Sequence, residues 1–392
     1  MKKLALYSAV GNEITQYDVD VEGALLTRRA SIKVPSNVQY AWFHPSRRQL
    51  YVASSDRGSA HDKKPAASNH LTALSIDSET GALSRHGSDI PLPQRAVHIC
   101  LDGAGRFVLS AHNVPTPGIT VNRINADGTL GECVPQPNAL DYGIYPHQVR
   151  VMPSDGAAIL VDRGNDAEHG KSEDPGALRI YRMNDDGVFS DPDVIAPNGG
   201  YGYGPRHMDF HPTQPWAYVS LERQSQLYVY RCSERGMAHE ASYMRDLLAD
   251  RGHEKPRQLA GTVHVHPNGR YVYVINRNSG TVDFRGQPVF NGGENHVVVF
   301  EIEPETCEPT LLQHADTHSY HVRTFALDPS GRLLVTASIT PLAVRHGDEV
   351  EVVPAALSVF RVGDDGRLTF VRKYDVPTHG KVHYWMNIVE LP

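Results

Sequence analysis

The chain has 392 residues, of which 40% are hydrophobic and 21% charged, with 33 glycines, 27 prolines and a formal net charge of -7. This composition is typical of a turn-rich globular protein. The acidic balance and the lack of a Lys/Arg run argue against a nucleic-acid-binding protein, and no apolar stretch is long enough to span a membrane.

The four cysteines are far apart in the sequence and form no CxxC pair. This spacing predicts neither a zinc site nor a disulfide framework. We therefore expect a protein of the reducing cytoplasm that uses no metal and no organic cofactor.

Along the chain, one short pattern of alternating apolar residues recurs seven times, each copy ending in a polar or acidic turn. Such alternation predicts a β-strand with one buried face. In chain order the copies are EITQYDVD at Glu13, HLTALSID at His70, GITVNRIN at Gly118, ALRIYRMN at Ala177, QLYVYRCS at Gln226, HVVVFEIE at His296 and ALSVFRVG at Ala356.

Six copies follow a longer pattern of strand, tight turn and strand, which is the signature of a β-hairpin. In chain order these are YAWFHPSRRQLYVAS, VHICLDGAGRFVLSA, VRVMPSDGAAILVDR, MDFHPTQPWAYVSLE, VHVHPNGRYVYVINR and FALDPSGRLLVTASI. His44, His211 and His266 come just before three of the turns. We expect these histidines to hydrogen-bond within the turns or between neighbouring units.

A hairpin plus a third strand, repeated around a ring, predicts an all-β fold, a seven-bladed β-propeller. The first unit lacks one strand of its hairpin, whereas VHYWMNIVEL near the C-terminus is a spare strand. We expect residues 382–391 to pair with residues 4–10 and close the ring, which makes residues 1–392 a single domain. MRDLLADR at Met244 predicts a short helix in a connection.

In a propeller blade, the innermost strand begins at the face of the ring where the second strand ends. Polar residues at these two places should therefore gather at one opening of the ring, called the mouth. Six positions before the turn proline, the innermost strands carry His147, Arg206 and Arg323, with Gln39 and Gly261 at the matching places. The ends of second strands carry Glu222 and Arg277, with Arg163 at a comparable place.

The stretch GPRHMDFHP places Arg206 at the rim of this mouth, next to His207. Strand alternation predicts that these two side chains point in opposite directions. The inserts 56–69, 164–176, 278–295 and 340–355 all follow second strands, and we expect them to overhang the same face.

Each candidate also has a purely structural interpretation. Arg206 and Arg277 could form salt bridges between blades, Glu222 could simply neutralise them, and His147 could be a buried histidine with satisfied hydrogen bonds. The sequence pattern is compatible with both interpretations.

Five motifs resemble, in blade order and over nearly the whole chain, those of the bacterial and fungal seven-bladed propeller lactonases. They are YPHQVRVMPSDG, GPRHMDFHP, YVSLERQS, HPNGRYVYVINRNSG and VRTFALDPSGRLLVTAS. The family includes propeller-type 6-phosphogluconolactonases and carboxy-cis,cis-muconate cyclases. The resemblance implies a catalytic set of His147, Arg206, Glu222 and Arg277. The family's PHxH form is PHQ here and two inserts are longer, so the resemblance leaves the substrate open.

Opening a lactone requires an activated water molecule and donors for the oxyanion that forms at the carbonyl. We predict His147 or Glu222 as the general base, with Arg206 and Arg277 binding the substrate's carboxylate or phosphate. The predicted additional substrate-binding residues are His98, Arg163, His207 and Arg323. The expected partner is a small anionic lactone, such as 6-phosphogluconolactone, or a dicarboxylate.

Three alternatives stay open at this point. The same residues, run in the opposite direction, would close a muconate-type diacid to a lactone. A non-catalytic propeller that binds proteins is less consistent with ionisable residues gathered at one mouth. A metal-dependent lactonase conflicts with the arginines, because cations compete with a divalent ion for the same space. The sequence makes no prediction of the oligomeric state.

Overall fold

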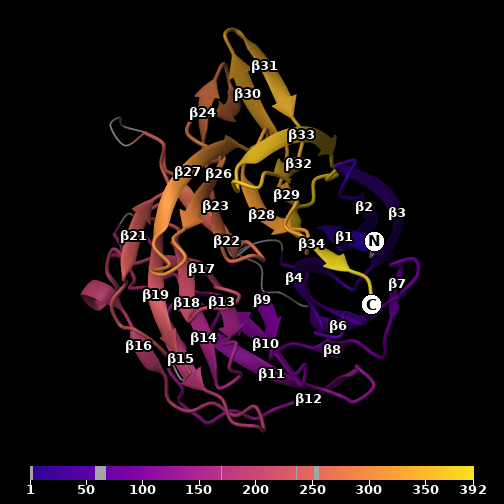
Figure 1. The fold of residues 1–392 in the computed structure, drawn as a ribbon, viewed down its shortest axis with the longest axis vertical. Coiled ribbons are helices and arrows are strands. Elements are labelled where there is room, and N and C mark those ends of the chain that lie inside the picture. The colour runs from indigo at the N-terminus through magenta and orange to yellow at the C-terminus, as the bar shows by residue number, and fades with distance from the viewer. Residues whose placement is uncertain (1–2, 58–67, 169, 235, 251–255) are drawn as a thin grey trace.

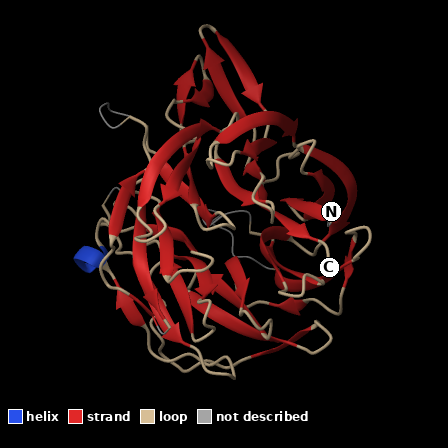
Figure 2. Ribbon diagram, in the orientation of Figure 1, coloured by secondary structure: helices blue, strands red, loops and turns tan. Residues whose placement is uncertain are grey.

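The computed structural model describes residues 3–57, 68–168, 170–234, 236–250 and 256–392 and shows seven blades arranged in a ring (Figure 1). The described residues are almost entirely strands and loops, and the one helix among them is a short 3-10 turn, Pro197–Gly200 (Figure 2). The predicted all-β, seven-bladed propeller is therefore confirmed. No helix in the described part of the chain is long and apolar enough to cross a membrane.

The strands of each blade are antiparallel neighbours, and blades 1 to 7 are numbered here by the chain order of their second strands. The innermost strands of blades 1 to 7 are β34 (His383–Glu390), β4 (Asn37–Phe43), β9 (Ala96–Leu101), β13 (Pro146–Val151), β17 (Pro205–Phe210), β22 (Leu259–Val265) and β28 (Val322–Leu327). The second strands are β1 (Leu4–Val10), β5 (Gln49–Ser55), β10 (Phe107–His112), β14 (Ala157–Asp162), β18 (Trp216–Leu221), β23 (Tyr271–Arg277) and β29 (Leu333–Ser338).

The third strands coincide with the seven repeated copies in the sequence, and a further strand or pair of short strands lies outside each of them. The third strands are β2 (Glu13–Asp20), β6 (Asn69–Ile76), β11 (Gly118–Ile124), β15 (Ala177–Arg182), β19 (Gln226–Ser233), β26 (His296–Ile302) and β32 (Ala356–Val362). The outermost are β3 (Leu25–Lys33), β7 (Leu83–Arg85) with β8 (Ile90–Pro91), β12 (Leu130–Cys133), β16 (Asp193–Ile195), β20 (Gly236–Met237) with β21 (Tyr243–Asp246), β27 (Pro309–Asp316) and β33 (Leu368–Asp375). Two inserted hairpins are β24 (Thr281–Phe284) with β25 (Gln287–Phe290), and β30 (Leu342–His346) with β31 (Glu349–Val353).

The ring closes through the two ends of the chain, as predicted. Strand β34 pairs antiparallel with β1, from Leu4 opposite Glu390 to Val10 opposite His383, and forms the inner edge of blade 1. Figure 1 shows the yellow C-terminal strand beside the indigo N-terminal ones. This pairing removes the free sheet edge that an open array of blades would expose.

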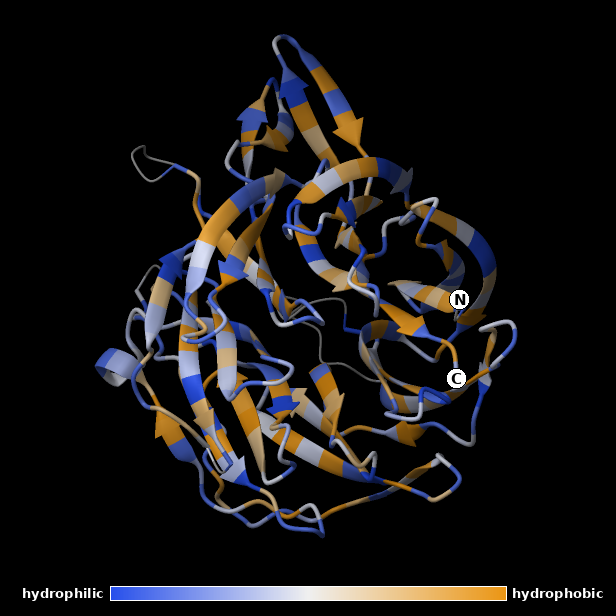
Figure 3. Ribbon diagram, viewed as in Figure 1, coloured by the Kyte–Doolittle hydropathy of each residue, from blue (hydrophilic) through white to orange (hydrophobic). Residues whose placement is uncertain are grey.

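The hydrophobic core lies between the blades. Second strands such as β10 and β14 are buried at every residue, because both faces of their sheet pack against a neighbouring blade. Figure 3 shows hydrophobic residues concentrated on strands throughout the ring. A separate hydrophobic cluster lies between each pair of adjacent blades, so every blade contributes to two clusters and the stability of the ring depends on every blade being present.

The turn histidines join consecutive blades, which confirms their structural role. The Nε2 atoms of His211 and His266 lie 2.9 Å from the carbonyl oxygens of Gly269 and Gly331 in the next blade, and His44 makes the same contact to its own neighbour at 3.2 Å. Gly269 and Gly331 adopt φ +74, where a side chain would be strained, and an added Cβ would lie within 2.6 Å of the histidine ring. These histidines are therefore fully used in holding blades together.

The predicted helix at Met244 is wrong. The segment instead forms β21, which pairs antiparallel with β19 from Val229 opposite Tyr243 to Gln226 opposite Asp246. A helix of two turns is marginal in water, whereas the outer edge of β19 offers unpaired backbone groups to an adjacent segment. The available sheet edge therefore decides the structure of this segment.

Candidate active site

Every innermost strand carries a β-bulge near the mouth, which we define as the end of the ring where innermost strands begin and second strands end. At each bulge the register shifts by one residue, so one residue of the innermost strand has no partner on the second strand. The bulge residues are Gln39, Val97, His147, Arg206, Gly261 with Thr262, Arg323 and Tyr384. Bulges interrupt strand alternation and redirect side chains, and they are frequent next to active sites.

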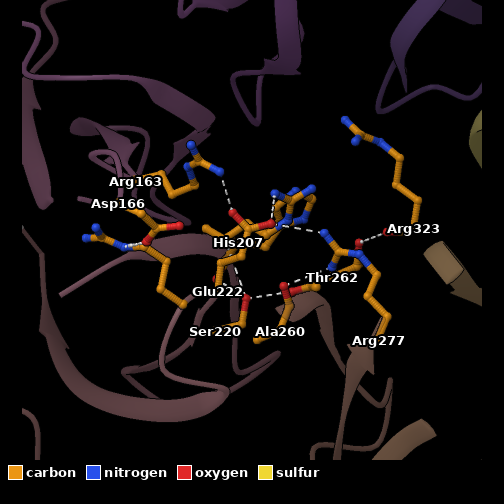
Figure 4. Close-up of polar contacts among 12 residues, drawn as sticks. Arg163, Asp166, His207, Ser220, Glu222, Ala260, Thr262, Arg277 and Arg323 are labelled. Atoms are coloured by element: carbon orange, nitrogen blue, oxygen red, sulfur yellow. Dashed lines mark hydrogen bonds and ion pairs between the residues drawn. The ribbon is translucent and has the colours of Figure 1, made fainter. Parts of the chain in front are cut away.

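Glu222, the residue after β18, binds three arginines at the mouth. Its Oε1 accepts hydrogen bonds from Arg206 Nη1 and, at 3.0 Å, from Arg277 Nη2, while Oε2 accepts one from Arg163 Nη1 at 2.9 Å (Figure 4). Arg206 lies on β17, Arg277 ends β23 and Arg163 follows β14, so this Glu222 cluster joins blades 4, 5 and 6. Three of the four predicted catalytic residues, with Arg163, thus meet in one buried group.

The Glu222 cluster holds three guanidinium groups and a single carboxylate, which leaves a surplus of positive charge. Burial acts to raise the pKa of Glu222, but Arg206, Arg163 and Arg277 outweigh it and lower this pKa to about 2. Burial lowers the pKa of Arg277 to about 10, although Glu222 opposes that shift. Glu222 is therefore an anion with both oxygens engaged, which makes it a weak general base and a strong anchor for the arginines.

Three histidines lie beside the cluster, on innermost strands of adjacent blades. The ring centroid of His207 is 5.1 Å from that of His147 and 6.0 Å from that of His98. Burial, and then nearby arginines, hold the pKa of all three well below 6.5, so they are neutral at neutral pH. Nδ1 of His147 is buried and has no hydrogen-bond partner among the residues described. A neutral imidazole with an unpaired nitrogen is suited to proton transfer with a bound substrate.

The expectation that Arg206 and His207 point in opposite directions is wrong. Arg206 contacts Glu222, whereas the adjacent His207 packs against His147, and all of these side chains lie in the same buried polar group. The bulge at Arg206 is the reason, because one extra residue in the strand breaks the alternation of faces.

Arg323, the bulge residue of β28, lies apart from the Glu222 cluster. Its guanidinium lies over the ring of Tyr384, 4.4 Å from the centroid. Figure 4 draws no contact from this guanidinium to the other residues shown, and only the backbone oxygen of Arg323 accepts a bond, from Thr262 Oγ1 at 2.9 Å. Arg323 is therefore at the mouth, as predicted, but belongs to a different part of it.

Three further residues of the mouth escape a count from the turn prolines: Arg95, Tyr145 and His321. Each lies two positions before a bulge residue, where the chain enters an innermost strand. The Arg163 guanidinium lies 4.3 Å from the ring centroid of Tyr145. Burial and then the charge of Arg277 lower the pKa of His321 to about 3. Counting eight positions back from the turn, rather than six, finds Tyr145 and His321 from Pro153 and Pro329, and finds Arg95 from Gly103, which replaces the turn proline in blade 3.

A hollow of about 560 Å³ opens at the mouth beside Arg163. Residues of the predicted inserts 164–176 and 278–295 line it, together with Tyr145 and Arg257. The insert 340–355 differs from expectation, because its hairpin β30–β31 extends beyond the rim of the ring (Figure 1). Most of the insert 56–69 lies outside the described residues.

We expect catalytic turnover to survive strong chelation. Within the described ranges, no group of three or more His, Cys, Asp or Glu side chains is placed to hold a metal ion. The surplus positive charge of the Glu222 cluster also repels a divalent cation. Assays before and after treatment with EDTA measure this directly, and activity that disappears and returns with added calcium or zinc would contradict it.

Comparison with known proteins agrees with the seven-bladed fold. Residues 4–346 match the model of a family described as lactonase, 7-bladed β-propeller. The chain is 25% identical over 395 residues to a 6-phosphogluconolactonase of Yersinia pestis, covering 98% of both chains, and 24% identical over 371 residues to one of Yersinia enterocolitica, covering 93% of this chain and 91% of the relative. A periplasmic gluconolactonase of Pseudomonas aeruginosa has a similar fold, with a TM-score of 0.72 at 19% identity over 100% of both chains.

Proposed function

Because the chain belongs to the family of seven-bladed β-propeller lactonases, we propose that it hydrolyses a small anionic lactone, with 6-phosphogluconolactone as the first candidate. The observation that carries this proposal is the Glu222 cluster, in which three arginines surround one carboxylate beside neutral histidines. The chain as a whole carries a formal charge of -7, so a positive mouth is a local feature that attracts anions. The relatives named 6-phosphogluconolactonase supply the candidate substrate.

Hydrolysis at this site proceeds without a covalent intermediate on the protein. His147 takes a proton from a water molecule as its oxygen bonds to the lactone carbonyl carbon, and Arg206 and Arg277 stabilise the resulting oxyanion. The ring carbon–oxygen bond then breaks, and the proton passes from His147 to the departing alkoxide, which gives a hydroxy acid. The negative charge that develops on the substrate offsets the field of the arginines, so it favours protonation of His147 at this step.

Glu222 acts by holding the arginines rather than by moving a proton. Both of its oxygens are engaged and its pKa is about 2, so it stays charged throughout the reaction. Fixed donors lose little free energy in reorganising when charge develops on the substrate, which is the main advantage of such a site. Of the two bases that the sequence allows, the structure therefore favours His147.

Arg206→Lys is expected to lower kcat/KM for the lactone by about 10-fold or more, which corresponds to about 1.4 kcal/mol. Lysine keeps the charge but lacks the planar guanidinium group, which can donate hydrogen bonds to Glu222 and to an oxyanion at the same time. We expect the melting temperature to change by only a few degrees. Steady-state kinetics and thermal melts on the same preparations measure both quantities.

Arg179→Lys is the matched control, because the half-buried Arg179 bridges two carboxylates, Asp162 and Asp141, on the outer part of blade 4. It should leave kcat/KM unchanged. A destabilised Arg206→Lys protein that keeps full activity would show that Arg206 serves only as a structural ion pair. Wild-type turnover of carboxymuconate but of no lactone would favour the cycloisomerase alternative.

A further inference from the structure

Arg95 is a buried cation whose hydrogen-bond partners are neutral. It lies just before β9 and is 4% exposed. Its Nε donates to Gln39 Oε1 at 2.7 Å and its Nη1 donates to Asn113 Oδ1 at 3.3 Å. Neither partner carries charge, and no carboxylate of the described chain pairs with Arg95. A buried charge without a counter-charge is costly, which is why such groups usually pair with an ion.

Arg323 brings a second positive charge to the same region. It stacks on Tyr384 of blade 1, and within the described residues it also has no carboxylate partner. Burial lowers the pKa of Arg95 to about 10, and the charge of Arg323 is the next largest influence in the same direction. Gln39, which holds Arg95, and Tyr384, under Arg323, lie at the bulges of two innermost strands that contact each other, β4 and β34, so both cations are held at the same part of the mouth.

The other arginines that are buried in the described chain, Arg206 and Arg277, have an acidic partner. Arg206 and Arg277 share Glu222, and Arg179 bonds to Asp162 at 2.7 Å. Arg95 and Arg323 differ in that two neutral amides and an aromatic ring fix them in place. This arrangement holds two cations ready for an anion that is not part of the protein.

We propose that Arg95 and Arg323 form a second subsite at the mouth, which binds an anionic group of the substrate, either phosphate or carboxylate. Arg95 comes from blade 3 and Arg323 from blade 7, and their supporting residues Gln39 and Tyr384 come from blades 2 and 1. The Glu222 cluster belongs to blades 4, 5 and 6, which blades 3 and 7 flank. A substrate that spans the mouth would place its anionic group on the Arg95–Arg323 subsite and its carbonyl against Arg206 and His147. This reaction geometry rests on the proposed function, whereas anion binding at the subsite does not.

Direct binding tests the subsite independently of turnover. Glucose 6-phosphate and glucuronate share a hexose ring but carry a phosphate and a carboxylate respectively, and glucose is the neutral control. By isothermal titration calorimetry, we expect wild-type protein to bind at least one of the charged sugars and not glucose. We expect Arg95→Gln and Arg323→Gln each to weaken that binding about 10-fold or more. The sugar that binds identifies the anionic group.

Arg123→Gln, on β11 and away from the mouth, is the matched control and should bind like wild type. Arg323 is partly exposed, so Arg323→Gln decides the question if Arg95→Gln does not fold. Wild-type affinity in the variants that fold, or no binding of either charged sugar by wild type, would overturn the subsite.

Steady-state kinetics test whether the Arg95–Arg323 subsite takes part in the reaction. For Arg95→Gln and Arg323→Gln, the ratio of kcat/KM for 6-phosphogluconolactone to that for uncharged gluconolactone should fall about 10-fold. If wild type hydrolyses neither lactone while the binding result holds, the proposed function fails and the subsite stands. If both lactones are hydrolysed and the ratio does not change, the subsite's role in the reaction is wrong.

Discussion

A chain that ends at Val382 is expected to lose the cooperative fold of the whole ring. The deletion removes β34, the innermost strand of blade 1, and with it every backbone pair to β1. Trp385, Met386, Ile388 and Val389 are all buried between blades. Burial of each such side chain contributes about 1.5–3 kcal/mol, so their combined loss is comparable with the total stability of a typical domain.

Thermal denaturation followed by circular dichroism or calorimetry measures this effect, and no cooperative transition is expected for the truncated chain. The matched control replaces residues 342–353, the β30–β31 hairpin, with a short turn. That deletion is of similar size but removes a hairpin that extends beyond the ring, so the melting temperature should shift by only a few degrees. An unchanged melting temperature after removal of β34 would show that ring closure does not hold the fold together.

The repeat pattern predicts this architecture well because each blade repeats the same local signals. A strand, a tight turn, a strand and a third strand recur in the sequence with little variation, and each corresponds to an observed element. The segment at Met244 is different, because its helical pattern is weak and the free edge of β19 determines its conformation. β21 pairs with β19 across a separation of 14 or more residues in the sequence. A local sequence pattern does not predict such tertiary pairing.

The repeat pattern also predicts part of the candidate site. Counting from the turn prolines places His147, Arg206 and Arg323 at the mouth because all three occupy bulge positions of innermost strands. No sequence pattern identifies the β-bulges, so the direction of the His207 side chain was predicted incorrectly. Arg95 was missed because the turn of its blade has Gly103 where other blades have a proline, so the count was not applied there, and because Arg95 lies in the segment before its strand.

Acidification is expected to unfold the protein steeply between about pH 6.5 and about pH 5, because several histidines are buried in the neutral form. Burial lowers the pKa of His112 and His383 to about 4 and that of His321 to about 3. His98, His147 and His207 shift in the same direction for the same reason. In the unfolded chain these side chains titrate near the ordinary value of 6.5.

The sign of the effect follows from which state binds more protons. As the pH falls below about 6.5, the unfolded chain takes up protons that the folded chain does not accept until the pH is near 4 or lower, so the free energy of unfolding falls. Each histidine contributes a slope of about 1.4 kcal/mol per pH unit, and six together approach about 8 kcal/mol per pH unit. Asp162 acts in the opposite sense, because burial raises its pKa, but it is one group against six.

His383 shows why the folded protein resists protonation. Its Nδ1 donates to the Ser338 carbonyl at 3.1 Å, and its Nε2 lies 2.7 Å from Ser8 Oγ, so the neutral ring satisfies both nitrogens without exposure to water. His383→Asn should reduce the pH slope of unfolding by about 1.4 kcal/mol per pH unit, even if it also lowers stability at neutral pH. Urea denaturation at several pH values measures these slopes, and a free energy of unfolding that stays constant down to about pH 5 would mean that the buried histidines already carry their protons in the folded state.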